Sequence, residues 1–237
     1  MDTGPTAGML GYTGGQDGVS VADTSLPHDP FTPLLNSDAN IRVEGPEALP
    51  VPTHNVSLQT TETTYSLMMH MSKALGVNCT FCHNTRSIAS WPASTPQRVT
   101  AWYGIRMVRD LNTAYRELAP LWADDTSHEG FAWIDCHDHE NSLVSLVRRD
   151  PRDGQLVAAV ANFTPTPRTE YRIGVPVAGA WRERLNSDAD IYGGSNMGNG
   201  GRVHATDEAH HGHPQSLSLT VPPLGFLLLQ PDGTGAP

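Results

Sequence analysis

The feature that most constrains this chain is a Cys-x-x-Cys-His motif formed by Cys79, Cys82 and His83. This spacing is typical of c-type haem attachment, in which both thiols add to the haem vinyl groups and the histidine becomes an axial ligand of the iron. The second axial ligand must come from elsewhere, and a methionine thioether is a usual choice. Met68 and Met71 lie shortly before the motif, in the preceding predicted helix. An unmodified redox dithiol, half of a zinc site and a chance pairing stay open as alternatives.

The motif lies between two predicted helices. Apolar residues at helical spacing predict a first helix from Thr61 to Leu75, which Gly76 ends. A second helix is predicted to begin at Thr95, a capping residue that is followed by proline at the first helical position. This helix should continue to Leu118, because Pro120 then breaks the pattern.

Beyond this point short apolar runs alternate with turn signals, which is typical of an all-β antiparallel sandwich. The expected strands are 131–134, 143–147, 156–163, 171–175, 217–221 and 226–229. The predicted fold class is therefore α + β with two unlike parts: an irregular and helical haem-binding segment, followed by the sandwich.

Three segments follow from these patterns. Residues 1–58 carry many glycine and proline breakers, so we expect an extended or irregular segment there. Residues 59–115 form the helical haem-binding segment, and residues 116–237 form the β-sandwich.

Composition bears on partners and location. The net charge of −10 disfavours nucleic acid and anionic membrane surfaces as partners. The sequence contains no apolar run of about 18 residues, so we expect no membrane span. The stretch from Met1 to Asp17 lacks a basic segment followed by an apolar one and does not resemble a signal peptide. This leaves a cytoplasmic apo-protein open as one location.

Two histidine-rich stretches are weaker candidates for a zinc site, and we favour solvated loop histidines instead. They comprise Cys136, His137, Asp138 and His139, and then His204, His210, His211 and His213.

Segments 7–16, 67–72, 75–84 and 94–110 closely resemble the tetrahaem cytochrome subunit of purple-bacterial photosynthetic reaction centres, at its third haem-binding segment. The resemblance implies that Cys79 and Cys82 anchor one covalent haem c, and that His83 and Met68 are the axial ligands. It also implies electron transfer to the photo-oxidised bacteriochlorophyll pair on the periplasmic side of the photosynthetic membrane. The reaction-centre core subunits and a soluble electron donor would be the partners. The family has four haem sites, whereas this chain has one such motif.

Segments 115–118, 130–136, 162–165, 186–189, 192–196 and 216–225 resemble the C-terminal end of 1,4-α-glucan (glycogen) branching enzymes. In that family the catalytic carboxylates lie in a (β/α)₈ barrel, which this chain lacks, so the resemblance implies no catalytic residue and no enzyme activity here. The alternative function is thus a catalytically incomplete fragment, with α-glucan as the alternative partner. We interpret the chain as a chimera with its seam inside 108–115.

Overall fold

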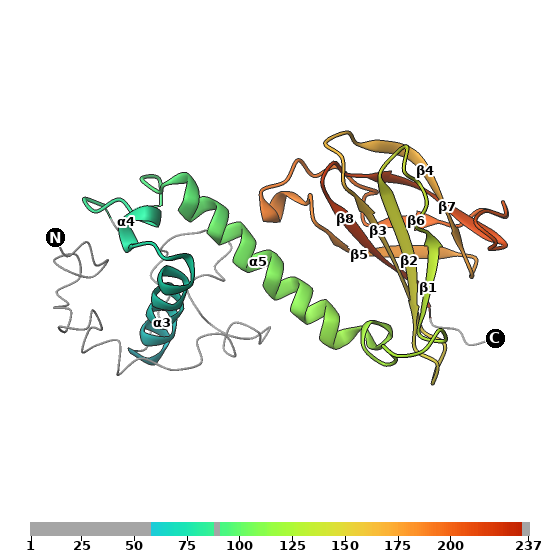
Figure 1. Ribbon diagram of the computed structural model, residues 1–237, viewed down its shortest axis with the longest axis horizontal. Helices are drawn as coiled ribbons and strands as arrows, with labels where there is room; N and C mark the ends of the chain where they lie inside the picture. Colours follow the sequence, from blue (N-terminus) through green and yellow to red (C-terminus); the bar gives the residue numbers. More distant parts are fainter. Residues whose placement is uncertain (1–57, 88–90, 234–237) are drawn as a thin grey trace. The chain divides into compact units, whose positions relative to one another are not determined.

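The computed structural model describes residues 58–87 and 91–233. The predicted irregular segment at 1–58 lies outside the described residues, apart from Leu58, the first residue of a helix. The chain divides into two compact units, Met1–Arg109 and Asp110–Pro237, and the division falls within a long helix. Each unit is described by itself (Figure 1).

In the first unit the predicted helices are confirmed. Helix α3 spans Leu58–Leu75, α4 is the four-residue helix Cys79–Cys82, and α5 spans Pro96–Glu117. Gly76 ends α3 in the left-handed region, at φ 64°, which glycine adopts without steric cost. Its amide donates to the carbonyl of Lys73 at 3.2 Å, which satisfies one of the last carbonyls of the helix.

A small apolar cluster packs α3 against the first turns of α5. Leu67 is almost fully buried, and Met68, Met71 and Ile105 lie against it. Trp102 is also buried, and its ring and the ring of Trp91 form a T-shaped pair with a centroid distance of 5.9 Å. The contact of Ile105 with the cluster around Leu67 joins α5 to α3 through apolar burial.

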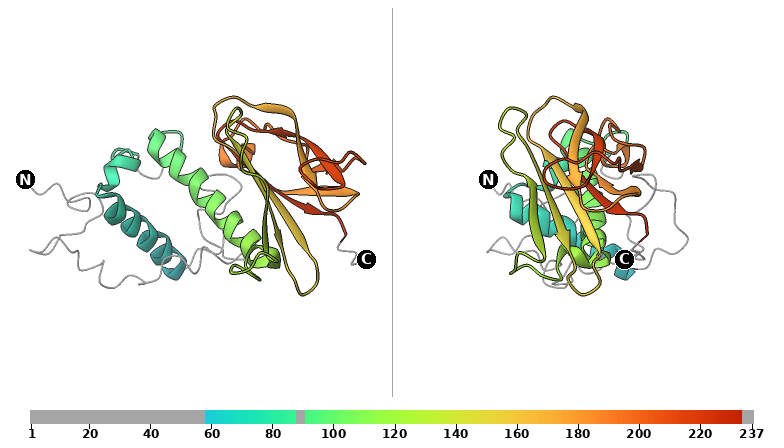
Figure 2. Two further views of the ribbon diagram at one scale, coloured as in Figure 1. Left: turned by 45° about the vertical axis from the view of Figure 1, so that its right-hand side comes forward. Right: turned by 90° about the vertical axis from the view of Figure 1, so that its right-hand side faces the viewer.

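The second unit is an antiparallel β-sandwich, as predicted. A six-stranded sheet has the order β1-β2-β3-β8-β5-β6, and β4 pairs with β7 in a two-stranded sheet (Figures 1 and 2). The strands are β1 Phe131–Asp135, β2 Leu143–Arg149, β3 Leu156–Asn162, β4 Arg168–Val175, β5 Ala180–Asn186, β6 Arg202–His204, β7 Gln215–Val221 and β8 Phe226–Pro231. Two 3-10 helices, η2 Ala119–Leu121 and η3 Asp190–Tyr192, lie in the connections.

The core lies between the two sheets and is built by alternating residues. In β7, Leu217, Leu219 and Val221 are buried and face inward, opposite residues such as Leu227 of β8 and Trp181 of β5. Each such side chain contributes about 1.5–3 kcal/mol by leaving water. This burial accounts for the sandwich that the period-2 patterns predict.

Two strands were not predicted from the sequence. Strand β5 places Trp181 and Leu185 in the interior, but charged residues separate them and a β-bulge interrupts the alternation. Strand β6 has three residues and only one partner, β5. Both are therefore too irregular or too short to give a clear strand pattern.

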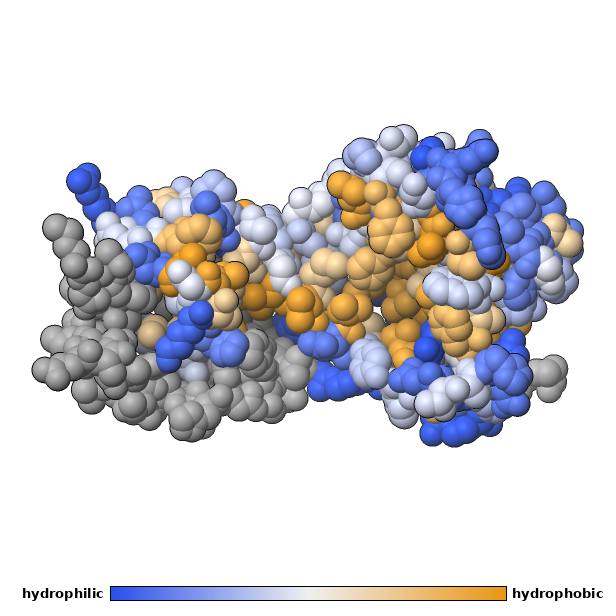
Figure 3. All heavy atoms as spheres, in the orientation of Figure 1, coloured by the Kyte–Doolittle hydropathy of each residue, from blue (hydrophilic) through white to orange (hydrophobic). Residues whose placement is uncertain are grey.

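The outer face of the six-stranded sheet is also covered. Ala114 and Leu118 pack against Val157, Leu185 and Leu228 on that face. Strand β3 is consequently buried on both sides, which explains why its sequence is an almost continuous apolar run. Hydrophilic residues, in contrast, cover the end of the sandwich at which β4 and β7 lie (Figure 3). Among the described residues, no helix has the length and apolarity that crossing a bilayer requires.

Candidate functional site

The two cysteines of the motif lie on one turn of helix. Positions i and i+3 of α4 share a side of the helix, so Cys79 and Cys82 face the same way. Asn78 caps this helix, since its side chain accepts from the amide of Thr80 at 3.1 Å. His83 follows directly and donates its amide to the carbonyl of Cys79 at 2.8 Å. Both thiols are free and partly buried.

Thr95 ties the motif to the start of α5. Its hydroxyl donates to the carbonyl of Cys82 at 2.8 Å and accepts from the amide of Arg98 at 3.3 Å. One side chain therefore fixes the end of α4 and caps α5.

Burial makes the two thiols weak acids. It raises the pKa of Cys79 and of Cys82, and at Cys82 the neighbouring Cys79 adds to this while the Arg98 cation opposes it. Because the thiolate is the reactive form, raised pKa values disfavour a fast redox dithiol, one of the alternatives left open by the sequence.

The donor types of the first unit fit a c-type haem. Two thiols lie on one helical turn, an imidazole follows them, and the thioether of Met68 is half-buried on α3. Cys79 and Cys82 would hold the group covalently, whereas His83 and Met68 would bind the iron. These four assignments stay predictions.

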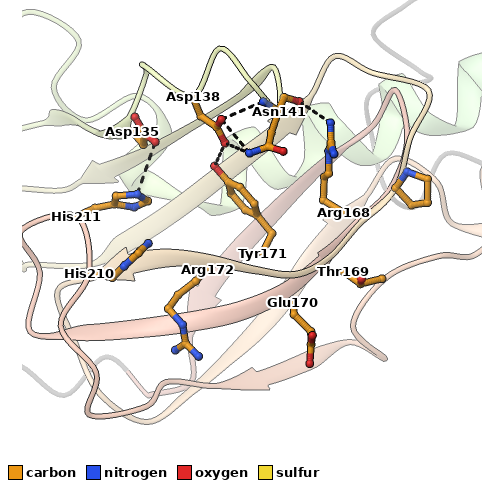
Figure 4. Close-up of a pocket in the computed structure, with 11 residues that line it drawn as sticks. Asp135, Asp138, Asn141, Arg168, Thr169, Glu170, Tyr171, Arg172, His210 and His211 are labelled. Atoms are coloured by element: carbon orange, nitrogen blue, oxygen red, sulfur yellow. Dashed lines mark hydrogen bonds and ion pairs between the residues drawn. The ribbon is translucent and has the colours of Figure 1, made fainter.

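A second candidate site is a hollow of about 480 Å³ in the sandwich (Figure 4). It is formed by the segment from the end of β1 to the start of β2, by the start of β4, and by the loop before β7. The lining residues are Asp135, Asp138, Asn141, Pro167, Arg168, Thr169, Glu170, Tyr171, Arg172, His210 and His211.

Asp138 organises one side of this hollow. Its carboxylate accepts from the backbone and side-chain amides of Asn141 at 3.0 Å and from the hydroxyl of Tyr171 at 2.8 Å. Partial burial would raise the pKa of Asp138, but these hydrogen bonds outweigh it and hold the pKa below its ordinary value. Burial and the same carboxylate raise the pKa of Tyr171.

His211 organises the opposite side. Its Nε2 lies 3.6 Å from the carboxylate of Asp135, and its Nδ1 accepts from the amide of Gly174 at 3.4 Å. Burial and the neighbouring His210 lower the pKa of His211, and Asp135 opposes this shift. Gly174 is required here, because a Cβ at this position would lie 1.9 Å from the carbonyl oxygen of His210.

The sequence did not group these residues. Asp138 and Tyr171 are far apart in the chain, and the packing of the two sheets against each other brings them together. The sequence instead indicates only a weak zinc candidate in the histidine-rich stretches, with solvated loop histidines favoured. Over 58–87 and 91–233, no cluster of three or more histidine, cysteine, aspartate or glutamate side chains is placed to hold a metal ion.

The hollow is lined by three carboxylates, those of Asp135, Asp138 and Glu170, but Asp138 is unsuited to proton donation. Glycoside chemistry needs one carboxyl group with a raised pKa as the general acid. The pKa of Asp138 is lowered, and its oxygens already accept hydrogen bonds. The polar side chains that line the hollow can therefore bind polar groups, but Asp138 cannot act as the general acid.

Known proteins match the two parts of the chain separately. The 1,4-alpha-glucan branching enzyme GlgB of Cupriavidus pinatubonensis is 53% identical over 131 residues, which are 55% of this chain and 18% of that protein. GlgB 1 of Xanthomonas axonopodis pv. citri is 51% identical over 127 residues, or 54% of this chain and 18% of its own length. These matches fall on the C-terminal half, and the chain spans less than a fifth of the relatives.

Two family models match as well. The model of the alpha amylase C-terminal all-beta domain matches residues 133–232, which agrees with the observed sandwich. The model of the photosynthetic reaction centre cytochrome C subunit matches residues 6–129, which is more than half of the chain. The chain therefore belongs to the family of the photosynthetic reaction centre cytochrome C subunit through residues 6–129, and its residues 133–232 are similar to the alpha amylase C-terminal all-beta domain.

Proposed function

We propose that the sandwich acts as a non-catalytic accessory domain of the 1,4-α-glucan branching enzyme type. The observation that carries this proposal is the complete antiparallel sandwich at the residues that match the alpha amylase C-terminal domain. The high identity to branching enzymes over the same half supports it. The lowered pKa of Asp138 makes this carboxyl group unsuited to serve as the general acid of glycosyl transfer.

A complementation experiment tests this role. A variant of the branching enzyme from Cupriavidus pinatubonensis that lacks its C-terminal domain (the shortened enzyme) is mixed with the full chain. Branching is followed by iodine staining of amylose. We expect the full chain alone to be inactive and the mixture to be more active or more stable than the shortened enzyme. Branching by the chain alone, or no effect on the shortened enzyme, would contradict the proposal.

A second candidate function is electron transfer by a haem c bound to the first unit. The specific observation in its favour is the pair of free thiols on one turn of helix, with His83 directly after them. When bound, haem would supply one-electron redox chemistry, and a methionine ligand would raise its potential. The partners would be reaction-centre core subunits and a soluble electron donor on the periplasmic side of the membrane.

In this candidate function, the role of the chain is to hold the haem and to orient the side chains that bind it. Thr95 fixes the carbonyl of Cys82 and the start of α5, so the two thiols and His83 keep a defined direction. The cluster around Leu67 holds Met68 on α3. No other chemistry is required of the protein for a one-electron carrier.

A pyridine haemochrome spectrum tests this candidate. The chain is produced with an added export signal and the cytochrome c maturation machinery. A c-type spectrum that is lost on Cys79→Ser with Cys82→Ser would support the haem site. Absence of covalent haem under these favourable conditions would refute it, and the same double variant controls for non-covalent haem.

The two functions belong to unlike halves, so the chain as a whole is best described as a chimera. Whether it arose by recombination or by design does not alter either test.

A further inference from the structure

The side chain of His211 joins the two sheets of the sandwich. Its Nδ1 accepts from the amide of Gly174 in β4 at 3.4 Å, and its Nε2 lies 3.6 Å from the carboxylate of Asp135 at the end of β1. Strand β4 belongs to the two-stranded sheet and β1 to the six-stranded one. Figure 4 shows the ring between Asp135 and His210, on the wall of the hollow. One imidazole therefore attaches the loop before β7 to both sheets.

The loop holds this histidine in a backbone conformation that suits other residues better. His210 and His213 exchange backbone hydrogen bonds at 3.0 and 2.9 Å, so they enclose a tight two-residue turn. Both central residues have positive φ, 47° at His211 and 76° at Gly212, as a type I′ turn requires. Asparagine or glycine fits the first of these positions best. The turn by itself gives no reason for a histidine, whereas the contacts of the ring do.

The amide of Gly174 depends on His211 for its hydrogen bond. Gly174 lies opposite Ser216 of β7, but the amide and the carbonyl of Ser216 bond with Thr206 instead, at 3.1 and 2.9 Å. Gly174 thus occupies a position of β4 whose amide points away from β7. The absence of a side chain at this glycine also lets the turn approach β4 closely.

A second contact holds the turn more weakly. Glu208 forms an ion pair with Arg172 at 3.1 Å, and the side chain of Glu208 is 61% exposed. Exposed ion pairs contribute little to stability, because water and salt screen them. The partly buried ring of His211 is therefore the principal attachment of the turn to β4.

Only the neutral ring of His211 can accept from Gly174. With Nδ1 as the acceptor, the ring proton lies on Nε2 and faces the carboxylate of Asp135. Protonation of the ring adds a proton at Nδ1, so two donors then face each other at Gly174. The hydrogen bond to β4 is lost, whereas the attraction to Asp135 remains. Acid therefore acts on the contact with the two-stranded sheet.

Charged groups of both signs surround the ring. The ionisable side chains that act on it or line the same hollow are Asp135, Asp138, Arg168, Glu170, Tyr171, Arg172, His210 and His213. Burial and the neighbouring His210, whose ring centroid lies 4.1 Å away, lower the pKa of His211, and Asp135 opposes this less strongly. Burial likewise lowers the pKa of His213, and Arg149 adds to this shift. The folded turn therefore favours uncharged rings at His211 and His213.

We propose that His211 is a pH-sensitive switch, which holds the turn on β4 when it is neutral and releases the turn when it is protonated. Because the folded turn favours the neutral ring, the contact contributes stability above 6.5, the ordinary pKa of histidine. That contribution is lost as the pH falls below this value. Release of the turn removes His210 and His211 from the wall and opens the hollow. The switch acts within the sandwich and does not depend on the accessory role proposed above.

Hydrogen exchange of the Gly174 amide, followed by NMR in the full chain, tests the switch. The switch variant is His211→Asn, because asparagine suits the turn and has no titratable ring. The matched control is His204→Asn, at an exposed histidine in β6. Between about pH 8 and about pH 5, the protection factor of this amide, corrected for intrinsic exchange, should fall at least tenfold in the unaltered chain and in the control. In the switch variant it should be low throughout and change less than twofold.

The NMR spectrum of the imidazole nitrogens gives a second test that needs no variant. At about pH 8 we expect the proton of His211 on Nε2 and none on Nδ1. A proton on Nδ1 would overturn the switch, as would constant protection of Gly174 in the unaltered chain or an equal fall in the switch variant. An equal loss of protection at Val160, in the buried strand β3, would also overturn it, because the whole sandwich would then be unfolding.

Discussion

Asp138 and Tyr171 form the hydrogen bond on which one side of the hollow depends. Replacing Tyr171 by phenylalanine removes the donor and leaves a partly buried carboxylate with one partner fewer. Hydrogen bonds to charged groups contribute about 1.5–3 kcal/mol. We therefore expect Tyr171→Phe to lower the free energy of unfolding of the sandwich by about that amount in urea denaturation. Tyr115→Phe, at an exposed position, should change it by less than about 0.5 kcal/mol.

The lowered pKa of Asp138 gives a second prediction at the residue scale. A carboxyl group whose pKa is lower in the folded state stabilises the fold above its ordinary pKa, 3.8, and loses that contribution as the pH falls through the folded value. The unaltered chain should thus be more stable than Asp138→Asn at pH 7. This difference should shrink as the pH falls below 3.8. A difference that stays constant down to pH 2 would contradict the assignment.

At the scale of elements, the beginning of α5 depends on Thr95. Thr95→Ala removes the cap of the helix and the hydrogen bond to the carbonyl of Cys82. Loss of a cap costs about 1 kcal/mol, so hydrogen exchange of the amides in the first turn of α5 should become several-fold faster. Thr100→Ala is the control, because the hydroxyl of Thr100 is exposed and donates to the carbonyl of Pro96, one turn earlier in the same helix. Equal exchange in both variants would contradict the capping role.

Ala114, near the end of α5, and Leu118, directly after it, cover part of the outer face of the six-stranded sheet. Leu118 is almost fully buried and packs with Val157 and Leu228. We expect Leu118→Ala to lower the free energy of unfolding of the second unit by about 2–5 kcal/mol, because a cavity remains. Leu111→Ala, at a position that is 37% exposed, should cost clearly less. Urea denaturation followed by circular dichroism in the β region measures both.

At the scale of the whole molecule, the proposed haem site and the sandwich belong to different units. The double variant Cys79→Ser with Cys82→Ser should therefore abolish covalent haem and leave the urea midpoint of the sandwich unchanged. Leu118→Ala should have the opposite effects. Haemochrome spectra and urea denaturation on the same preparations measure this. Loss of both properties in either variant would show that the two units are not independent.

Much of the fold could be predicted from the sequence, because it depends on local patterns. The periodic apolar residues and Gly76 predicted α3, and Thr95 with its following proline predicted α5. Six of the strands followed from short alternating runs. Strand β5 was missed because Arg182, Glu183 and Arg184 hide its alternation, and these residues are accommodated only by their positions in the sheet.

The sequence by itself determined the Cys-x-x-Cys-His motif, the two helices around it and the all-β character of the second half, since each depends on residues close together in the chain. Only the tertiary structure decided the hollow. Asp138 meets Tyr171, and Asp135 meets His211, through the pairing of β4 with β7 and the packing of the sheets. Such contacts join residues that are distant in sequence, so no local pattern records them, and the physical reason is that burial of the core fixes the sheets against each other.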